Sequence, residues 1–369
     1  MKLIETDRDT LLKPLQTVTG IVERRHTLPI LSNVLIERRQ QKISFIATDL
    51  EIQITTSVED TSPINEERSV TVPAKKLQDI LRALPDTVQV TLETGENRLH
   101  AKAGKSRFNL QTLPVEDFPK FPESTEPQAK ITVKQKELKH ILSMVQYAMA
   151  QQDIRYYLNG LLLLMEDNYL KVVATDGHRL AFALMLLEAP QEKKEVILPR
   201  KVVLELTRLL NEVDEPVTVE LLQNQVRFIF SEVILVSKVV DGKFPDYNRV
   251  IPEGYDKQFD INRLLLLQTL QRASILSNEK FRGVRLILTS GNLRIVCNNS
   301  EQEEAQEELE LQYEGEALDI GFNITYLLDV LNHLNCETVR CAFGDANSSA
   351  LISIPGNNDF KYVVMPMRI

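Results

Sequence analysis

The sequence of 369 residues has no tryptophan, only three cysteines and no long apolar run. Cys297, Cys336 and Cys341 form no C-x-x-C pair, which fits a reducing cytoplasm rather than a disulfide framework. Wholly apolar runs, such as 161–165 and 264–267, are far too short to span a bilayer. Charged residues in the first segment, MKLIETDRDT, stand where a signal peptide needs apolar ones, so we expect no export and a cytoplasmic protein.

Motifs for catalysis, metal binding and nucleotide binding are also missing. The five histidines show no H-x-x-x-H or H-E-x-x-H spacing, and no G-x-S-x-G segment marks a nucleophile. The segment AGKSR, Ala103–Arg107, resembles the end of a phosphate-binding loop. However, Leu99 stands where that motif needs its first glycine, and a strand is expected where it needs a helix. We therefore interpret AGKS as a hairpin turn and predict no catalytic residue, no metal site and no cofactor.

The chain instead repeats one order of features three times. A strand runs into a polar turn in SFIATDLEIQI (Ser44–Ile54), LKVVATDGHRLAF (Leu170–Phe182) and LRIVCNNSEQEEA (Leu293–Ala305). Asp49 and Asp176 lie 127 residues apart, and Asp176 and Asn299 lie 123 residues apart. A period of about 125 residues is too long for a solenoid unit, so we expect each repeat to be a whole domain.

Proline-punctuated segments mark the boundaries between these repeats. EDFPKFPE (Glu116–Glu123) and GKFPDYNRVIPE (Gly242–Glu253) place Phe118 and Phe244 at the same point of successive repeats. Boundaries near residues 125 and 254 follow. The predicted domains are 1–125, 126–254 and 255–369.

Each repeat has the hydrophobic pattern of an α+β unit. In the helix expected from Ala74 to Leu84, the residues Leu77, Ile80, Leu81 and Leu84 form one apolar stripe. Short alternating runs follow it, as strands of an antiparallel sheet do. The predicted fold class is therefore α+β, with three domains that each pack two helices against antiparallel sheet.

Charge is divided unevenly between the helices and the rest of the chain. The formal net charge is −9, which on its own argues against a nucleic-acid partner. The six expected helices span 9–25, 73–84, 132–147, 199–211, 260–273 and 323–335. Together they nevertheless carry a net charge of +7, and the rest of the chain carries −16. Lys75 and Arg82 share one helix face, and Lys201 and Arg208 repeat that pair 126 residues later. Solvation explains any single lysine, but this segregation indicates a basic surface that contacts the phosphates of a polyanion.

The turn Asp176–Arg179 places an acid, a histidine and an arginine around one glycine. An acid beside an imidazole suits general acid–base or triad chemistry. The histidine is absent from the corresponding turns at 49–51 and 299–301, and adjacent residues of an extended chain point to opposite faces. We therefore favour binding over catalysis at this turn.

One acidic segment and one apolar segment bear on possible partners. The acidic run EQEEAQEELE, Glu301–Glu310, is either a solvated stretch or the counterpart of a basic edge on another subunit. The tail YVVMPMRI, Tyr362–Ile369, is apolar where chain ends are usually polar and frayed. Since methionine side chains repack easily, we expect this tail to line a surface that accepts several partners.

Seven segments spread over all three repeats match the hallmarks of one known family. They are TLPILSNVLIE, DIRYYLNG, VATDGHRLA, DGKFPDYNRV, ILSNEKFRGVRL, GFNITYLLDVLN and YVVMPMRI. Together they resemble the bacterial DNA sliding clamps, the beta subunits of DNA polymerase III. The resemblance implies a non-catalytic subunit that makes a replicative polymerase processive. It also implies a homodimeric ring of six domains, in which twelve helices line a hole around duplex DNA.

The resemblance further implies three sets of site residues. A groove between the second and third domains would bind short peptides of the polymerase, the clamp loader and repair proteins through apolar anchors. Its residues would be Leu158, Thr175, Gly177, His178, Arg179, Leu180, Pro245, Arg249, Val250, Phe281, Asn323, Tyr326, Ser349, Val363, Val364, Met365, Pro366, Met367 and Arg368. Sequence-independent contacts to the duplex would come from Arg24, Lys75, Gln152, Tyr156, Tyr157 and Lys201. The dimer seam would join Phe108 and Leu110 of one chain to Ile275 and Leu276 of the other.

Two departures from the family pattern concern the peptide preference. Asn347 stands where the family's groove is often apolar, and Ile369 replaces a final leucine. Two alternative functions also remain at this point. One is a three-domain scaffold that binds only proteins, and the other is a hydrolase that uses His178.

Overall fold

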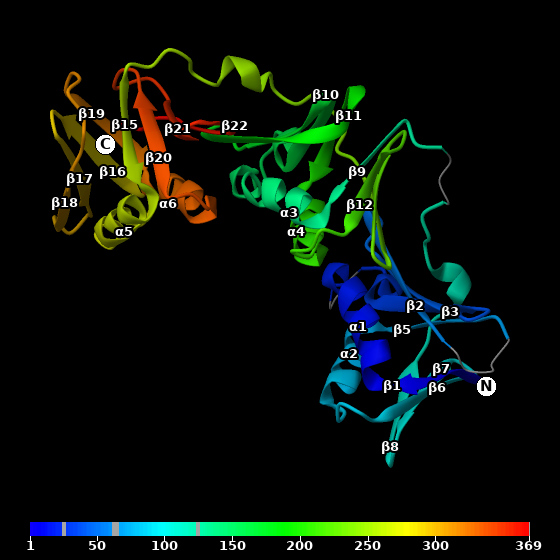
Figure 1. Cartoon of the computed structure of the whole chain (residues 1–369). Helices are drawn as coiled ribbons and strands as arrows, with labels where there is room; N and C mark the ends of the chain where they lie inside the picture. The colour runs from blue at the N-terminus through cyan, green and yellow to red at the C-terminus, as the bar shows by residue number, and fades with distance from the viewer. Residues whose placement is uncertain (24–26, 61–65, 123–125, 369) are drawn as a thin grey trace. The chain divides into compact units, whose positions relative to one another are not determined.

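The structure is a computed structural model, and it describes residues 1–23, 27–60, 66–122 and 126–368. Its contacts divide the chain into two compact units (Figure 1). The first contains Met1–Lys136 and Leu204–Val239, and the second contains Glu137–Val203 and Val240–Ile369. Of the sequence predictions, Arg24, Ile369 and the boundary at residue 125 lie outside the described residues.

The first unit contains helices α1 (Arg8–Val18) and α2 (Ala74–Ala83) and two antiparallel sheets. The strands are β1 (Lys2–Asp7), β2 (Asn33–Arg39), β3 (Lys42–Thr48), β4 (Ile52–Glu59), β5 (Arg68–Pro73), β6 (Gln89–Gly95), β7 (Arg98–Ala103), β8 (Ser106–Gln111), β9 (Ala129–Lys134), β12 (Pro216–Leu221), β13 (Gln225–Phe230) and β14 (Val233–Lys238). One sheet has the order β5-β2-β3-β4-β14-β13-β12-β9, and the other has the order β1-β6-β7-β8. Helix α1 packs on α2 and contacts both β1 and β4, so the helices bridge the two sheets.

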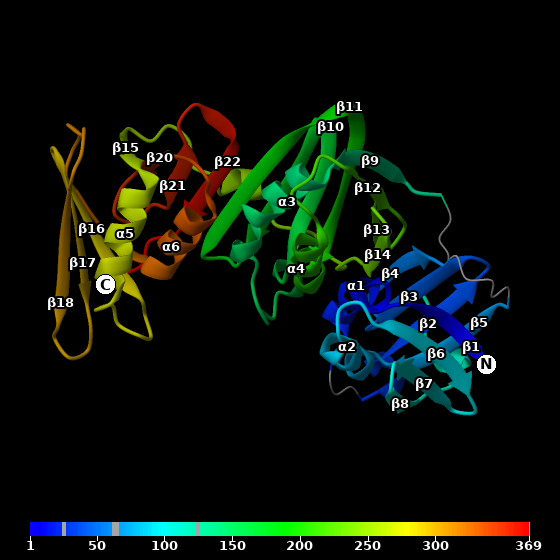
Figure 2. The ribbon, with the colours of Figure 1, turned by 60° about the horizontal axis from the view of Figure 1, so that its bottom comes forward.

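The second unit has the same construction, as Figure 2 shows for α5 (Arg263–Ser274) and α6 (Ile324–His333). Its strands are β10 (Gly160–Thr175), β11 (Arg179–Pro199), β15 (Lys257–Asn262), β16 (Gly283–Thr289), β17 (Asn292–Asn298), β18 (Glu304–Glu310), β19 (Leu318–Asn323), β20 (Thr338–Phe343), β21 (Ala350–Ile354) and β22 (Asn357–Val364). They form one sheet of order β10-β11-β22-β21-β20-β15 and another of order β18-β17-β16-β19. Helices α5 and α6 pack on each other and contact both sheets.

Both long sheets continue across the predicted domain boundaries. In the first unit β4 pairs with β14, where Ile54 lies opposite Leu235. In the second unit β11 pairs with β22, where Leu180 lies opposite Val363. A division by contacts therefore cuts through the middle repeat, because each half of that repeat is hydrogen-bonded to a different neighbour. Helices α3 (Gln135–Ser143) and α4 (Arg200–Leu209) lie at this cut.

The apolar stripe predicted for 74–84 is confirmed at Leu77 and Leu81, which are buried, whereas Ile80 is half-buried and Leu84 follows the end of α2. The predicted AGKS turn connects β7 to β8. Two helices begin later than predicted. The prediction of a helix over 132–147 was wrong at its start, since α3 begins at Gln135. Thr132 and Val133 instead pair with β12, because β-branched residues suit a strand. Similarly, Asp260 belongs to β15 and not to α5. Among the described residues, no helix is long and apolar enough to cross a membrane.

A buried ion pair ties the two sheets of the first unit together. The Arg38 side chain on β2 is 0% exposed and pairs with the Asp60 carboxylate, which is 6% exposed. The same Nη1 atom of Arg38 donates a hydrogen bond of 2.9 Å to the main-chain oxygen of Leu3 on β1. One guanidinium therefore connects the edge of one sheet to a strand of the other.

Replacing Asp60 with alanine should lower the free energy of unfolding by about 3–5 kcal/mol, because it removes the carboxylate that pairs with the buried charge of Arg38. Urea denaturation followed by circular dichroism measures this loss. The matched control is Glu5→Ala, which breaks an exposed pair with Lys2 and should leave the denaturation midpoint nearly unchanged. Equal midpoints for the two variants would contradict a structural role for the buried pair.

Candidate functional site

The turn between β10 and β11 is held by the side chain of Asp176. Its Oδ1 atom accepts hydrogen bonds from the backbone nitrogens of His178 (2.9 Å) and Arg179 (3.0 Å). Asp49 and Asn299 cap the corresponding turns of the other repeats in the same way. The acid that suggested catalysis is therefore a repeated turn cap.

The other carboxylate oxygen of Asp176 is also occupied. Oδ2 accepts a hydrogen bond of 3.1 Å from Nε of Arg179, whereas the His178 side chain is exposed to solvent. Both oxygens are thus used to shape the turn and hold the arginine. What this arrangement offers is a fixed surface for binding, and it does not form an acid–histidine pair.

A cavity of about 270 Å³ lies beside this turn, wholly within the second unit. Its lining is mainly apolar, with a few polar groups from the turn and the preceding loop. The lining residues are Arg155, Tyr157, Leu158, Thr175, Gly177, His178, Arg179, Leu180, Phe244, Pro245, Tyr247, Val250, Val363 and Met365. An apolar concavity with a small number of fixed polar groups is typical of a ligand-binding site.

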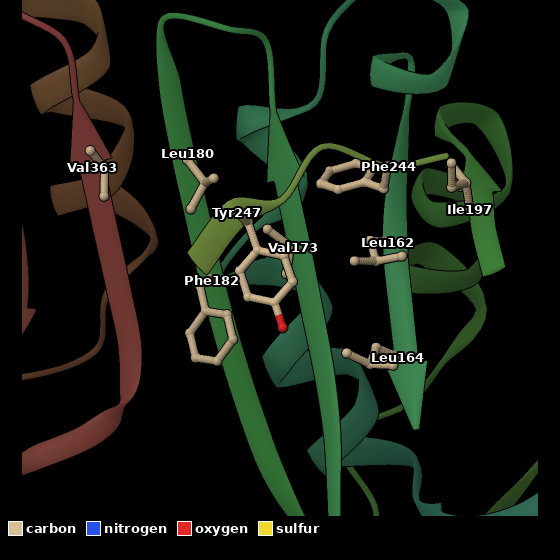
Figure 3. Packing of buried hydrophobic residues seen from close by; sticks show 9 residues of the cluster. All are labelled: Leu162, Leu164, Val173, Leu180, Phe182, Ile197, Phe244, Tyr247 and Val363. Carbon is tan, nitrogen blue, oxygen red and sulfur yellow. The ribbon is translucent and has the colours of Figure 1, made fainter. Parts of the chain in front are cut away.

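The cavity is supported by a buried cluster between β10, β11, β22 and the segment that follows β14 (Figure 3). The cluster consists of Leu162, Leu164, Val173, Leu180, Phe182, Ile197, Phe244, Tyr247 and Val363. The ring of Tyr247 stacks on that of Phe182 with 5.8 Å between ring centroids. Leu180 and Val363 belong to this packed cluster and also line the cavity, so part of the wall of the cavity is preformed.

Arg155 forms a cationic rim at one side of the cavity. Its guanidinium donates to both carboxylate oxygens of Asp153, at 3.0 and 2.8 Å, and to the main-chain oxygen of Asp176 at 3.2 Å. The hydrogen bonds from Arg155 lower the pKa of Asp153 to about 2. The pair therefore stays ionised at neutral pH and connects the 153–159 loop to the 176–179 turn.

The apolar tail of the chain is held at the 176–179 turn and at Gly321. The backbone nitrogen of Met365 donates to the oxygen of His178 (2.9 Å), and that of Met367 donates to the oxygen of Gly321 (2.8 Å). These bonds fix the main chain, while the Met365 side chain remains 48% exposed. The tail is therefore an ordered wall with an accessible methionine, as an adaptable binding surface requires.

The structure gathers about half of the predicted groove residues around this cavity. Those that line it are Leu158, Thr175, Gly177, His178, Arg179, Leu180, Pro245, Val250, Val363 and Met365. Arg249, Phe281, Asn323, Tyr326, Ser349, Val364, Pro366, Met367 and Arg368 are not part of its lining. Among these, Phe281 is 59% exposed, and Met367 is hydrogen-bonded next to Asn323, the N-cap of α6.

The sequence prediction missed Arg155, Phe244 and Tyr247 as lining residues, and it assigned Tyr157 to DNA. The FPDYN segment and the alignment of Phe244 with Phe118 were available signals for two of them. Nothing in the sequence pattern separates Tyr157, at the cavity, from Tyr156, which is 58% exposed.

The other predicted site residues lie in separate places. Lys75 and Lys201 occupy the first turns of α2 and α4, and Gln152 is exposed with a φ of 56°. Phe108 and Leu110 lie on β8, the edge strand of a four-stranded sheet. Ile275 and Leu276 follow α5. Within the described part of the chain, no group of His, Cys, Asp and Glu side chains is arranged to hold a metal ion.

Comparison with known proteins gives one consistent result. Residues 1–122, 132–246 and 248–368 match the N-terminal, central and C-terminal domains of the DNA polymerase III beta subunit. The chain is 48% identical to the beta sliding clamp of Pseudomonas putida over 98% of both chains. It is 44% identical to that of Escherichia coli K12, over 98% of this chain and 99% of the relative. A crystal structure of the DNA polymerase III subunit beta of Pseudomonas aeruginosa superposes with a TM-score of 0.96 at 47% identity, covering 100% of both chains.

Alanine at Gly177 should strain the turn and displace Arg155. Gly177 has a φ of 88°, where an L-residue costs about 1–2 kcal/mol, and a Cβ there would lie 2.9 Å from both terminal nitrogens of Arg155. We expect a loss of about 1–2 kcal/mol in the free energy of unfolding, and a crystal structure of the variant should show Arg155 moved away from the Asp176 carbonyl. Gly291→Ala, with a φ of 76° and no described atom within 4 Å of its Cβ, is the control for backbone strain alone. An unmoved Arg155 in the Gly177 variant would refute the predicted collision.

Proposed function

The chain belongs to the beta subunits of bacterial DNA polymerase III, the beta sliding clamps, and on this basis we propose that two copies close around duplex DNA and dock partner proteins in the cavity beside the 175–180 turn. It is a processivity factor of the polymerase and has no catalytic role of its own. Its fold consists of three clamp domains, each with two helices on antiparallel sheets. This function replaces both the scaffold and the hydrolase alternatives.

The observation that carries the ring proposal is the repeated pairing of edge strands. At two successive junctions, a strand that follows a capped turn pairs with the last strand of the next repeat: β4 with β14, and β11 with β22. Strand β18 follows the third capped turn and is a sheet edge, and β8 ends the first repeat and is also a sheet edge. Pairing of β18 with β8 of a second copy repeats the same junction, and two such contacts close a ring.

The side chains near these two edges support that pairing. Ile275, the C-cap residue of α5, is 77% exposed and is therefore accessible to a partner. Strand β18 carries several exposed glutamates, whereas Arg107 and Lys105 are exposed on and beside β8. The acidic run is thus assigned to a basic edge of another subunit, with Phe108, Leu110, Ile275 and Leu276 as the apolar part of the seam.

The duplex is proposed to contact basic and polar residues of the helices and of the 150–159 loop. Lys75 and Lys201 begin α2 and α4 at the same point of successive repeats. Such contacts reach phosphates and carry no sequence information. The remaining proposed contacts are Gln152, Tyr156, Tyr157 and Arg24, the last of which lies outside the described residues.

The groove is proposed to receive short segments of the polymerase, the clamp loader and other replication or repair proteins. Its apolar lining suits peptide anchors, and Arg155 at the rim suits an acidic or carbonyl group of the ligand. The clamp of P. aeruginosa, 47% identical over both whole chains, has been crystallised bound to griselimycin. We propose that griselimycin binds this chain in the cavity beside the 175–180 turn, and we use it as a probe.

We keep the proposed domain boundaries near residues 125 and 254 and place the protein in the cytoplasm. The repeats define these boundaries in the sequence, whereas the compact units reflect which strands pair across them. The cysteines Cys297, Cys336 and Cys341 are all free thiols, which suits a reducing compartment.

A topological clamp should remain on nicked circular DNA and run off the same plasmid after it is linearised. After loading by a clamp loader, gel filtration of the protein–DNA mixture measures the retained fraction, and light scattering measures the mass of the free protein. A dimer retained on circles alone supports the proposal. Equal loss from circles and linear DNA would show that retention is not topological.

Ile275→Asp provides the matched variant for this experiment. A charge at the apolar seam should give a monomer by mass and remove the retention on circles. Leu186→Asp changes another exposed aliphatic residue, with 68% exposure, on β11 and should remain a retained dimer. A dimeric Ile275→Asp protein would contradict the proposed seam.

Ending the chain after Val364 should weaken griselimycin binding at least about tenfold, because it removes Met365 and the bond that fixes the tail to His178. Strand β22 is retained in this variant, so the sheet and the circular dichroism spectrum should be unchanged. Isothermal titration calorimetry gives the dissociation constants. Met365→Leu keeps an apolar side chain of similar size and should bind nearly as the unmodified protein does. Unaltered binding by the shortened chain would exclude the tail from the site.

A further inference from the structure

Arg179 extends from the cavity into the protein and contacts three separate segments. Its side chain is only 9% exposed. Nη1 donates to Oδ2 of Asp329 on α6 (2.5 Å), and Nη2 donates to the main-chain oxygen of Tyr147 (2.7 Å). With the bond from Nε to Asp176, all three nitrogens of the guanidinium are used. The groove residue Arg179 is thus held from behind by side-chain and main-chain oxygens.

Aromatic rings enclose the same guanidinium. Its carbon lies 4.4 Å from the centroid of the Tyr326 ring and 5.7 Å from that of Tyr147. The Tyr147 ring stacks on His333, with 4.4 Å between centroids, and the hydroxyl of Tyr362 donates to the oxygen of Tyr326 at 2.9 Å. Two rings, Tyr326 of α6 and Tyr147 of the 146–148 turn, therefore lie against one cation, and His333 and Tyr362 pack against the Tyr147 ring.

The charge on Arg179 is retained in this enclosure. Burial acts to lower the pKa of Arg179. The interactions with Tyr362, Asp329 and Asp176 raise it by more than burial lowers it, so the pKa lies above its ordinary value. Burial also raises the pKa of Tyr147. A permanently charged guanidinium among neutral rings depends on its carboxylate partners, and Asp329 is the one supplied by α6.

The walls of the groove depend on where Arg179 is held. The residue before it, His178, accepts the hydrogen bond that fixes Met365, and the residue after it, Leu180, pairs with Val363. Both neighbours line the cavity, whereas Asp329 and Tyr147 do not. A change at Asp329 therefore reaches a ligand only through Arg179 and its turn.

We propose that Asp329 is a positioning residue of the docking groove, which holds Arg179 from α6 and thereby fixes the separation between the 176–179 turn and the Met365 wall. The inference rests on the proposed peptide-docking function of this groove. It assigns part of the ligand affinity to a residue that touches no ligand, and it connects groove occupancy to helix α6. By the reciprocity of coupled equilibria, a ligand in the groove should in turn stabilise the contacts of α6.

Asp329→Asn in the full-length protein tests the proposal with griselimycin as the probe. The amide keeps the shape of the carboxylate but loses its charge. We therefore expect the dissociation constant of griselimycin, measured by calorimetry, to rise about tenfold, which is equivalent to about 1.4 kcal/mol of binding free energy. The matched control is Asp260→Asn, which removes a carboxylate that pairs with Arg340 at 2.7 Å on β15 and β20 of the same unit. Its affinity should be unchanged.

A double-mutant cycle distinguishes positioning from a general structural role. In the background of Arg179→Ala, Asp329→Asn should have no further effect on affinity, because both act through one contact. Additive losses, or an unchanged affinity for Asp329→Asn alone, would overturn the inference. Failure of the unmodified protein to bind griselimycin would instead contradict the proposed docking function. If Asp329→Asn does not fold, as judged by circular dichroism, Asp329→Glu replaces it in the same cycle, since it keeps the charge but changes the reach to Arg179.

Discussion

Main-chain hydrogen bonding between edge strands of neighbouring repeats is the interaction that unites this chain. Strand β4 is completed by β14, and β11 is completed by β22, so a repeat does not finish its own sheet. A strand edge left open is a template for association. The chain covers two such edges internally, and β8 and β18 remain at the ends of their sheets. In the proposed dimer, the pairing of β8 with β18 would therefore be the same physical event as the joining of the domains within one chain.

The same capped turn occurs in each repeat, but its surroundings differ. In the first repeat the linker returns over the sheet, where the backbone nitrogen of Phe121 donates to Gln53 at 2.8 Å and Lys238 lies 5.9 Å from the Phe121 ring centroid. In the second repeat the positions equivalent to Leu50 and Ile52 are Gly177 and Arg179, and a cavity lies beside them. A glycine and a long cation thus distinguish the turn beside the proposed docking surface from the turn of the first repeat.

The sequence alone predicted the repeats, the α+β class and the AGKS hairpin turn, because these depend on local periodicity and on proline and glycine at fixed offsets. It placed the starts of two helices wrongly, since residues such as Thr132 follow cross-strand pairing that no local pattern reveals. The groove residues came from family resemblance. The contacts of Arg179 with Asp329 and Tyr147 join residues 150 and 32 positions apart, and a single sequence contains no record of such a meeting.

Strand β22 has a consequence for the order in which the protein becomes competent. Its residue Val363 completes both the sheet of β11 and the wall of the groove. Synthesis proceeds from the N-terminus, and domains generally fold as they emerge. The earlier segments therefore fold first but present no finished docking surface until the last strand has been made. If the groove docks replication proteins as proposed, a chain that lacks β22 would therefore be unable to recruit them.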